Sequence, residues 1–110
     1  IAHDCVVEND VVFSNNVTLG GNTFVMKKSQ LGFNTIVHQN QVIGSFSMIG
    51  MGSIITKKII IKPGFVYAGN PAKKIKFNTY GIKLKKVKKM DILKETQRFK
   101  EIIKKHPLYG

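Results

Sequence analysis

The chain has 110 residues, of which 43% are hydrophobic and 22% are charged, a size and composition that fit one ordinary folded domain. No apolar run approaches the roughly 18 residues of a membrane-spanning helix, and Ile1 is not followed by a basic and apolar leader. Its only cysteine, Cys5, excludes an internal disulfide and fits a reducing compartment. These features predict a cytoplasmic protein without a membrane span.

Positive charge is concentrated in the last third of the chain. Residues 1–72 carry five lysines and three acidic residues, a net charge of +2, whereas residues 73–110 carry thirteen Lys or Arg and three acidic residues, a net charge of +10. Such a basic surface attracts an acidic partner through its electric field. A solvated basic helix without a specific partner is the alternative.

Residues 1–72 repeat with a period of six. When the chain is written in sixes from Ile1, the first position of all twelve units is apolar or aromatic, ending with Tyr67. An amphipathic helix would instead repeat its apolar residues at intervals of three and four. The fourth position holds residue types that tolerate a positive φ at a tight turn: Asp4, Asp10, Asn16, Asn22, Asn34, Asn40, Gly52, Gly64 and Asn70. Each unit is therefore predicted to be a short strand followed by a corner.

Three such units per turn give a triangular coil of 18 residues. Residues 1–72 are thus expected to form about four coils of an all-β parallel β-helix, with unbroken pairing from coil to coil. The small residues at the fifth position, such as Cys5, are expected to point inward, which makes this cysteine a core residue rather than a nucleophile.

Residues 73–110 are expected to form a basic, helical C-terminal extension. A bend containing Asn78 and Gly81 leads to an amphipathic helix near 90–105, which Asp91 caps and Pro107 ends. The apolar face of this helix is expected to hold Ile92, Leu93, Phe99, Ile102 and Ile103.

Four segments carry a resemblance to a known family. They are Ile1-Ala2-His3-Asp4-Cys5, Asn15-Asn16-Val17-Thr18-Leu19-Gly20-Gly21, Val37-His38-Gln39 and Gly50-Met51-Gly52-Ser53. In this order and spacing they resemble the catalytic region of the UDP-N-acetylglucosamine O-acyltransferases. These are hexapeptide-repeat enzymes that make lipid A, the anchor of lipopolysaccharide. The resemblance implies left-handed coils, the C-terminal part of such an enzyme, and a homotrimer whose active sites lie between subunits.

An 18-residue coil would place His3, Gly21 and Gln39 above one another at one corner. A histidine beside an exposed glycine N–H offers a base of near-neutral pKa and a donor for an oxyanion. The resemblance implies that His3 is the general base, that the Gly21 N–H binds the oxyanion, and that Asp4 orients the imidazole or stabilises its charge. A solvent-facing turn histidine is the alternative for His3.

The resemblance also implies substrate contacts from Asn22, His38, Gln39, Asn78 and Lys85. Asn22 stands where the family usually has a histidine, so it can bind a sugar hydroxyl without titrating. Lys85, preceded by a leucine, replaces part of a family arginine pair and offers a point charge instead of a bidentate grip on phosphate. An ordinary turn pair is the alternative for His38 and Gln39.

Met51 occupies a third position of the repeat, between Gly50 and Gly52. The resemblance implies that this position forms the floor of an acyl groove. A methionine there predicts a shorter acyl chain than a glycine would admit. Lateral packing between coils is the alternative.

The predicted reaction is the transfer of a 3-hydroxyacyl group from acyl carrier protein to the 3-hydroxyl of UDP-N-acetylglucosamine. No tightly bound cofactor is expected, because the phosphopantetheine of the carrier protein is the donor, and the basic extension would steer that acidic partner. Three alternatives remain: N-acylation of a UDP-3-amino sugar, acetyl-CoA-dependent O-acetylation of a sugar, and an inactive scaffold.

Other functions are disfavoured. Only His3 and His38 lie in the repeat, and their spacing is not that of a metal site. The aromatic residues of the extension form no stacking platform for nucleic acid. Because the family has further coils before the His-Asp motif, the chain is expected to be a fragment or a shortened relative, with Ile1 as a truncation point.

Overall fold

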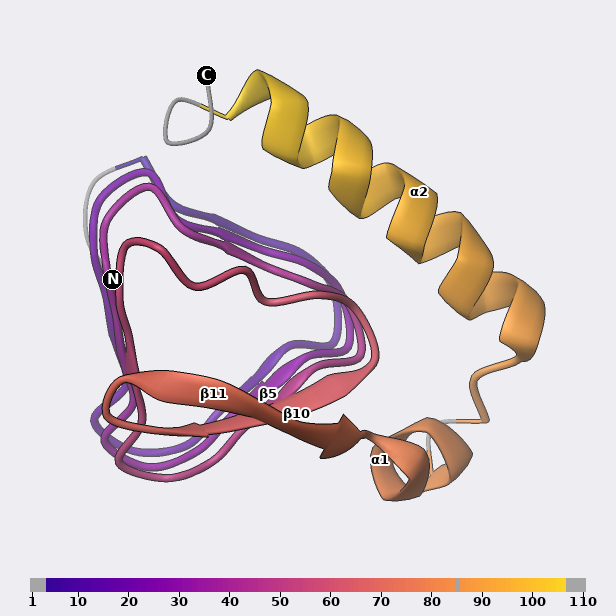
Figure 1. Cartoon of the computed structure of the whole chain (residues 1–110), viewed down its shortest axis with the longest axis horizontal. Coiled ribbons are helices and arrows are strands. Elements are labelled where there is room, and N and C mark those ends of the chain that lie inside the picture. Colours follow the sequence, from indigo (N-terminus) through magenta and orange to yellow (C-terminus); the bar gives the residue numbers. More distant parts are fainter. Residues whose placement is uncertain (1–3, 85, 107–110) are drawn as a thin grey trace.

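The computed structural model describes residues 4–84 and 86–106. Nine two-residue strands wind along a triangular path, and two longer strands and two helices follow them (Figure 1). The short strands are β1 (Val6–Val7), β2 (Val12–Phe13), β3 (Thr18–Leu19), β4 (Phe24–Val25), β5 (Gln30–Leu31), β6 (Ile36–Val37), β7 (Val42–Ile43), β8 (Met48–Ile49) and β9 (Ile54–Ile55). The later elements are β10 (Phe65–Gly69), β11 (Ala72–Phe77), α1 (Thr79–Leu84) and α2 (Lys89–Lys105).

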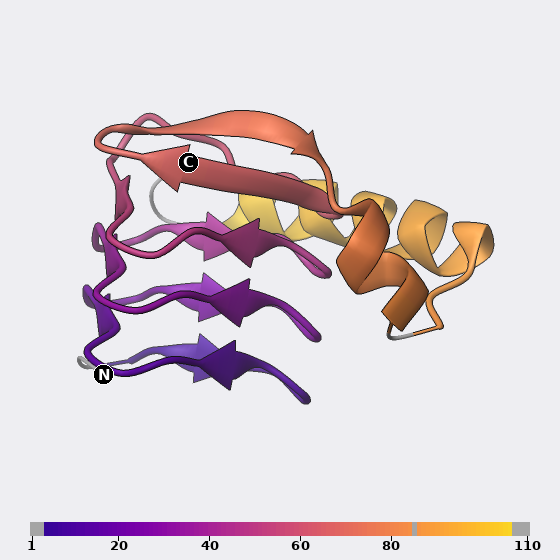
Figure 2. The same ribbon diagram turned by 90° about the horizontal axis from the view of Figure 1, so that it is seen from below.

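The short strands stack on three faces, β1–β4–β7, β2–β5–β8 and β3–β6–β9. Every pair of neighbours on a face is parallel and joins residues 18 apart, as Val6 with Phe24 and Thr18 with Ile36. Figure 2 shows the successive turns as layers. The predicted parallel β-helix with an 18-residue turn is therefore confirmed.

The fourth predicted coil is only partly formed. Ile61 makes an isolated bridge with Ile43, and β10 pairs with β8, but the third face is not continued. The chain instead reverses after β10, and β11 pairs with β10 in the antiparallel sense, across the predicted boundary at residues 72 and 73. The reversal places Gly69 at φ 109°, a region open mainly to glycine, so the positive φ expected at Asn70 is found one residue earlier.

First-position side chains fill the inside of the triangle. Nine of those described are at most 2% exposed: Leu19, Val25, Leu31, Val37, Ile43, Ile49, Ile55, Ile61 and Tyr67. Each lies above the residue 18 positions earlier, so the apolar area removed from water is continuous from turn to turn. Cys5 packs against this core as predicted, and its thiol donates a hydrogen bond to the Gly20 carbonyl (3.2 Å).

The corners follow from the fourth and fifth positions. The fourth position of ten units adopts a positive φ, and these include Lys28 and Phe46, whose residue types do not favour it. At the fifth position, the buried hydroxyls of Thr23 and Thr35 donate to the carbonyls three residues earlier, at 2.6 and 2.8 Å. These bonds pair corner carbonyls that regular strand pairing leaves without a partner.

The segment predicted as a bend is the short helix α1, and Asn78 caps it. The Asn78 Oδ1 accepts the Gly81 N–H (3.2 Å), while its Nδ2 donates to the Phe46 carbonyl of the β-helix (2.9 Å). Asn78 is only 8% exposed. This side chain therefore fixes where the chain leaves the β-helix.

Helix α2 lies along the β1–β4–β7 face (Figure 1). Lys88 occupies its N-cap position, and the predicted cap, Asp91, acts from three residues further on, where its Oδ2 accepts the Lys88 N–H at 2.9 Å. Phe99 is buried between the helix and Met26 and Val42, but the predicted placement of Leu93 on the buried face is wrong, because Leu93 is 58% exposed.

The position buried in place of Leu93 belongs to Glu95, a charged residue that is 5% exposed. The periodicity of apolar residues could not predict the burial of Glu95, because its carboxylate is held by polar partners on the β-helix. Pro107, predicted to end the helix, lies outside the described residues.

Candidate active site

One corner of the triangle brings together four of the predicted catalytic and substrate-binding residues. The parallel pairing of β3 with β6 places Gly21 directly below Gln39, and the Asn40 N–H donates to the Gly21 carbonyl at 2.7 Å. We call this the Gly21 corner, made of Gly21, Asn22, His38 and Gln39. His3, the predicted base, lies outside the described residues.

The Gly21 N–H has no hydrogen-bond partner within residues 4–84 and 86–106. The glycine is partly exposed and has no side chain to cover this donor. An N–H group in such a position is free to bind an oxygen that gains negative charge during a reaction. The geometry of Gly21 is thus compatible with the role predicted for it.

Asp4 and Asn22, two further predicted site residues, are both exposed. Asp4, at φ 60°, is exposed at the lower turn of the β-helix. Asn22 is also exposed, and its carbonyl lies 2.7 Å from Nε2 of His106, a hydrogen bond in the tautomer protonated at that nitrogen. The end of α2 therefore reaches the Gly21 corner, a contact across 84 positions for which the sequence contains no signal.

His38 and Gln39 are both exposed. Nδ1 of His38 lies 2.9 Å from the carbonyl oxygen of Gln39. If Nδ1 carries the proton, that nitrogen donates to the carbonyl and Nε2 is left as an acceptor. The pair can then offer solvent an imidazole acceptor and a carboxamide.

The other predicted site residues lie elsewhere in the chain. Met51 is 74% exposed at the corner before β9, so the β3–β6–β9 sheet separates it from the Gly21 corner. Asn78 bonds to Phe46 near the remaining corner, and both ends of its amide are used within the chain. Lys85 lies outside the described residues. A single chain therefore spreads the predicted site over three corners.

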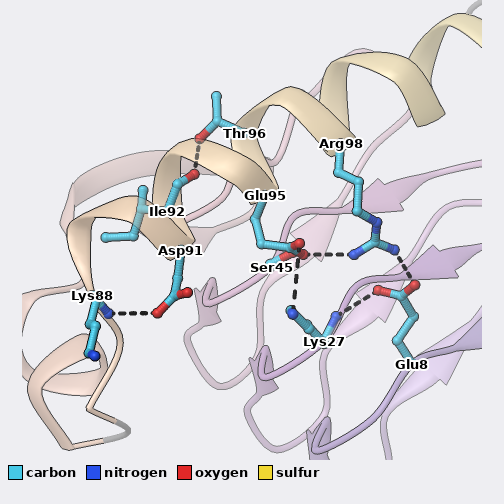
Figure 3. A network of polar contacts seen from close by, with 9 residues as sticks. All are labelled: Glu8, Lys27, Ser45, Lys88, Asp91, Ile92, Glu95, Thr96 and Arg98. Carbon is cyan, nitrogen blue, oxygen red and sulfur yellow. Dashed lines mark hydrogen bonds and ion pairs between the residues drawn. The ribbon is translucent and has the colours of Figure 1, made fainter.

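Sequence reasoning missed a polar network that joins α2 to three turns of the β-helix (Figure 3). Arg98 pairs with Glu8 of the first turn and, at 2.7 Å, with Glu95 of its own helix. Glu95 also accepts the Ser45 hydroxyl at 2.5 Å, and Lys27 approaches it to 3.9 Å. Only the pair Glu95 and Arg98, three residues apart on one helix, could have been noticed from spacing.

The charges in this network keep Arg98 protonated. Burial acts to lower the pKa of the guanidinium, but the hydrogen bonds and the negative charges of Glu8 and Glu95 outweigh it, so the pKa lies above its ordinary value. Glu8 in turn accepts the Lys27 backbone N–H at 3.1 Å. The guanidinium of Arg98 is therefore a permanently charged partner for the two carboxylates.

The described part of the chain has no cluster of metal-ligating side chains and no membrane-spanning helix. No three of its His, Cys, Asp and Glu side chains come together in a way that could hold a metal ion. None of its helices is long and apolar enough to cross a membrane.

Comparison with known proteins places this geometry in context. No family model matches the chain. It is 42% identical over 84 residues to the acyl-(acyl-carrier-protein)–UDP-N-acetylglucosamine O-acyltransferase of Thiobacillus denitrificans, covering 76% of this chain and 31% of that protein. The crystal structure of UDP-N-acetylglucosamine O-acyltransferase from Moraxella catarrhalis superposes with a TM-score of 0.75 and 32% identity, covering 96% of this chain and 40% of that one.

A more distant likeness is to the serine acetyltransferase of Brucella abortus, with a TM-score of 0.63, 26% identity and coverage of 67% of this chain and 32% of that one. The chain spans about a third of the length of the curated relatives it matches. The predicted left-handed parallel β-helix is confirmed by these likenesses together with the three stacked faces.

Proposed function

We propose that this chain, which belongs to the family of UDP-N-acetylglucosamine O-acyltransferases, serves in the transfer of a 3-hydroxyacyl group from acyl carrier protein to the 3-hydroxyl of UDP-N-acetylglucosamine. The observation that carries the proposal is the open Gly21 N–H on a corner whose next turn presents His38 and Gln39. Such a corner offers an oxyanion donor beside polar groups that can hold a sugar.

The proposed reaction uses His3, Asp4 and Gly21. His3 removes the proton of the sugar 3-hydroxyl as the oxygen attacks the thioester carbonyl, and the Gly21 N–H stabilises the oxyanion that forms. The carbon–sulfur bond then breaks, and His3 returns the proton to the departing phosphopantetheine thiolate. Asp4 holds the imidazole and stabilises its positive charge.

Asn22, His38 and Gln39 are proposed to bind the nucleotide sugar. All three are exposed at the Gly21 corner and carry donors and acceptors that match hydroxyl and amide groups. Asn78 is a weaker candidate, because its amide is buried and already bonded within the chain. Lys85 is retained in the proposal as a point charge for phosphate.

The spread of site residues over three corners supports a homotrimer. Met51 and the Gly21 corner lie on opposite edges of one sheet, so neither completes a site within its own chain. Three-fold symmetry can bring one corner of a subunit against a different corner of its neighbour. A site assembled in this way would use residues of two subunits.

The acyl carrier protein is proposed to approach along α2. The exposed lysines of this helix are Lys89, Lys94, Lys100, Lys104 and Lys105. These positive charges attract an acidic protein and raise its association rate at low salt. No contact between α2 and such a partner is needed for this steering.

The experiment is an assay with 3-hydroxyacyl carrier proteins of graded chain length and UDP-N-acetylglucosamine, with the product read by mass spectrometry. We expect product from the unmodified chain and from the control Asn9→Ala, a corner residue of the same turn, and none from His3→Ala. Product from His3→Ala would contradict the role of the base, and absence of product with every donor would contradict the activity.

The same assay separates the alternatives. An O-acyl product is an ester and is cleaved by mild alkali, whereas the product of a 3-amino sugar is an amide and survives. Acetyl-CoA is added as a further donor, because the likeness to a serine acetyltransferase favours testing it. A preference for shorter acyl chains would support the role proposed for Met51.

A further inference from the structure

The third position of the repeat lies at a corner, and its residues in the described part of the β-helix are nearly all polar or small. They are Asn9, Asn15, Gly21, Lys27, Gln39, Ser45, Lys57, Pro63 and Gly69. Phe33 and Met51 are the two large apolar exceptions in that part of the chain. Their side chains are 48% and 74% exposed. Large exposed apolar side chains mark a contact surface when they form one contiguous patch.

These two exceptions occupy the same corner on successive turns. They are 18 residues apart, and the parallel pairing of β5 with β8 holds the two turns in register. The Gly52 N–H donates to the Phe33 carbonyl at 2.7 Å, and a Cβ on Gly32 would lie only 2.7 Å from the Met51 nitrogen. The backbones of the two turns therefore touch, which keeps the phenyl ring and the thioether beside each other.

A hollow of about 180 Å³ lies beside this corner. Phe33 and Met51 line it together with Gln30, Gly32, Met48 and Gly50. The two glycines have no side chains to fill the hollow. Met48 adds a third apolar side chain, of which 37% is exposed. The hollow is small and its lining is largely apolar, which suits a single alkyl chain rather than a folded partner.

We propose that Phe33 is a second determinant of acyl-chain length, closing this hollow one turn below Met51. The inference rests on the proposed function, which supplies the acyl chain. A phenyl ring has few rotamers and is flanked by backbone of the next turn, so it cannot withdraw easily, whereas methionine is flexible. Phe33 would then set a rigid limit and Met51 an adaptable one.

The test measures binding of 3-hydroxyacyl-pantetheines of graded chain length to four proteins: the unmodified chain, Phe33→Ala, Met51→Ala and the double variant. Discrimination of one methylene by an apolar wall is worth roughly 10-fold or more in affinity. We expect Phe33→Ala to raise affinity for the first excluded chain length by about that factor, and the double variant to admit the longest chains. Leu93→Ala, which removes a similarly exposed side chain from α2, is the matched control and should leave the profile unchanged.

An unchanged profile in Phe33→Ala, or no binding of any acyl chain to any of the four proteins, would overturn the proposal. So would a change in oligomeric state, measured by sedimentation, without a change in chain length, because Phe33 would then contact a second copy. The enzymatic assay is separate. Length-dependent binding without acylated sugar would support the acyl groove but contradict the proposed function. Acylated product whose chain-length preference does not change in Phe33→Ala would contradict only the role of Phe33.

Discussion

The β-helix and the C-terminal extension are held together in different ways. In the β-helix the same contact recurs every 18 residues, and fully buried side chains such as Val25 and Ile43 stack on one another. In the extension, α2 buries one large apolar residue, Phe99, with the partly buried Ile102 and Ile103 beside it, and adds single polar contacts through Glu95 and Arg98.

This difference decides how local a disturbance is. A stacked core shares each side chain between neighbouring turns, so loss of one residue weakens the whole stack. A helix attached through a few single contacts can detach while the rest stays folded. Substitutions in the two regions should therefore differ in how far their effects spread.

Replacing Ile43 by alanine should reduce the free energy of unfolding of the β-helix by about 2–5 kcal/mol, because it leaves a cavity where the side chain is 0% exposed. Urea denaturation followed by circular dichroism measures it. Ile36→Ala is the control, since that residue sits in an equivalent short strand but is 46% exposed, and its effect should stay below about 1 kcal/mol. Equal losses would mean that the stack is not what stabilises the fold.

Replacing Glu95 by glutamine should destabilise the docking of α2 by about 1–3 kcal/mol, because Arg98 and Ser45 lose a buried charged acceptor. Hydrogen exchange should rise in residues 89–105 and remain unchanged in the β-helix. Glu101→Gln removes an exposed carboxylate of the same helix and serves as control. Faster exchange throughout the β-helix would show that the two regions unfold as one unit.

Tyr67 lies where the two regions meet, and it should give the smallest effect. Burial raises the pKa of its phenol above the ordinary 10.0, although the Lys62 N–H bonded to the phenol oxygen works in the other direction. The folded state thus holds the proton more tightly. Its contribution to stability is present below the ordinary pKa and is lost as pH rises through the higher folded value.

Tyr67→Phe should therefore lose less stability than the unmodified chain as the pH rises. At every pH it should also be less stable by about 1 kcal/mol, because the hydrogen bond from the Lys62 N–H is missing. Denaturation midpoints measured from neutral pH to about pH 11 follow it. Tyr80→Phe, at an exposed phenol, is the control. Identical alkaline profiles in Tyr67→Phe and the unmodified chain would contradict the assignment.

The candidate site was predictable only in part. Gly21, His38 and Gln39 meet at one corner because the period of 18 fixes which residues stack. The distance of Met51 from that corner, and the use of Asn78 as a helix cap, depend on which corner each turn reaches and on what the next element packs against. Phe33 stood out only once its exposure beside Met51 was known.

The strands, the corners and the turn length could be predicted from the amino-acid sequence alone, because a six-residue period is a local property that each unit repeats. The start of α2 could be predicted as well, from the nearby Asp91. The end of the coil at Gly69 and the contact of Glu8 with Arg98 across 90 positions depend on how the folded chain packs. Such contacts occur once, between residues far apart in the chain, so no spacing records them.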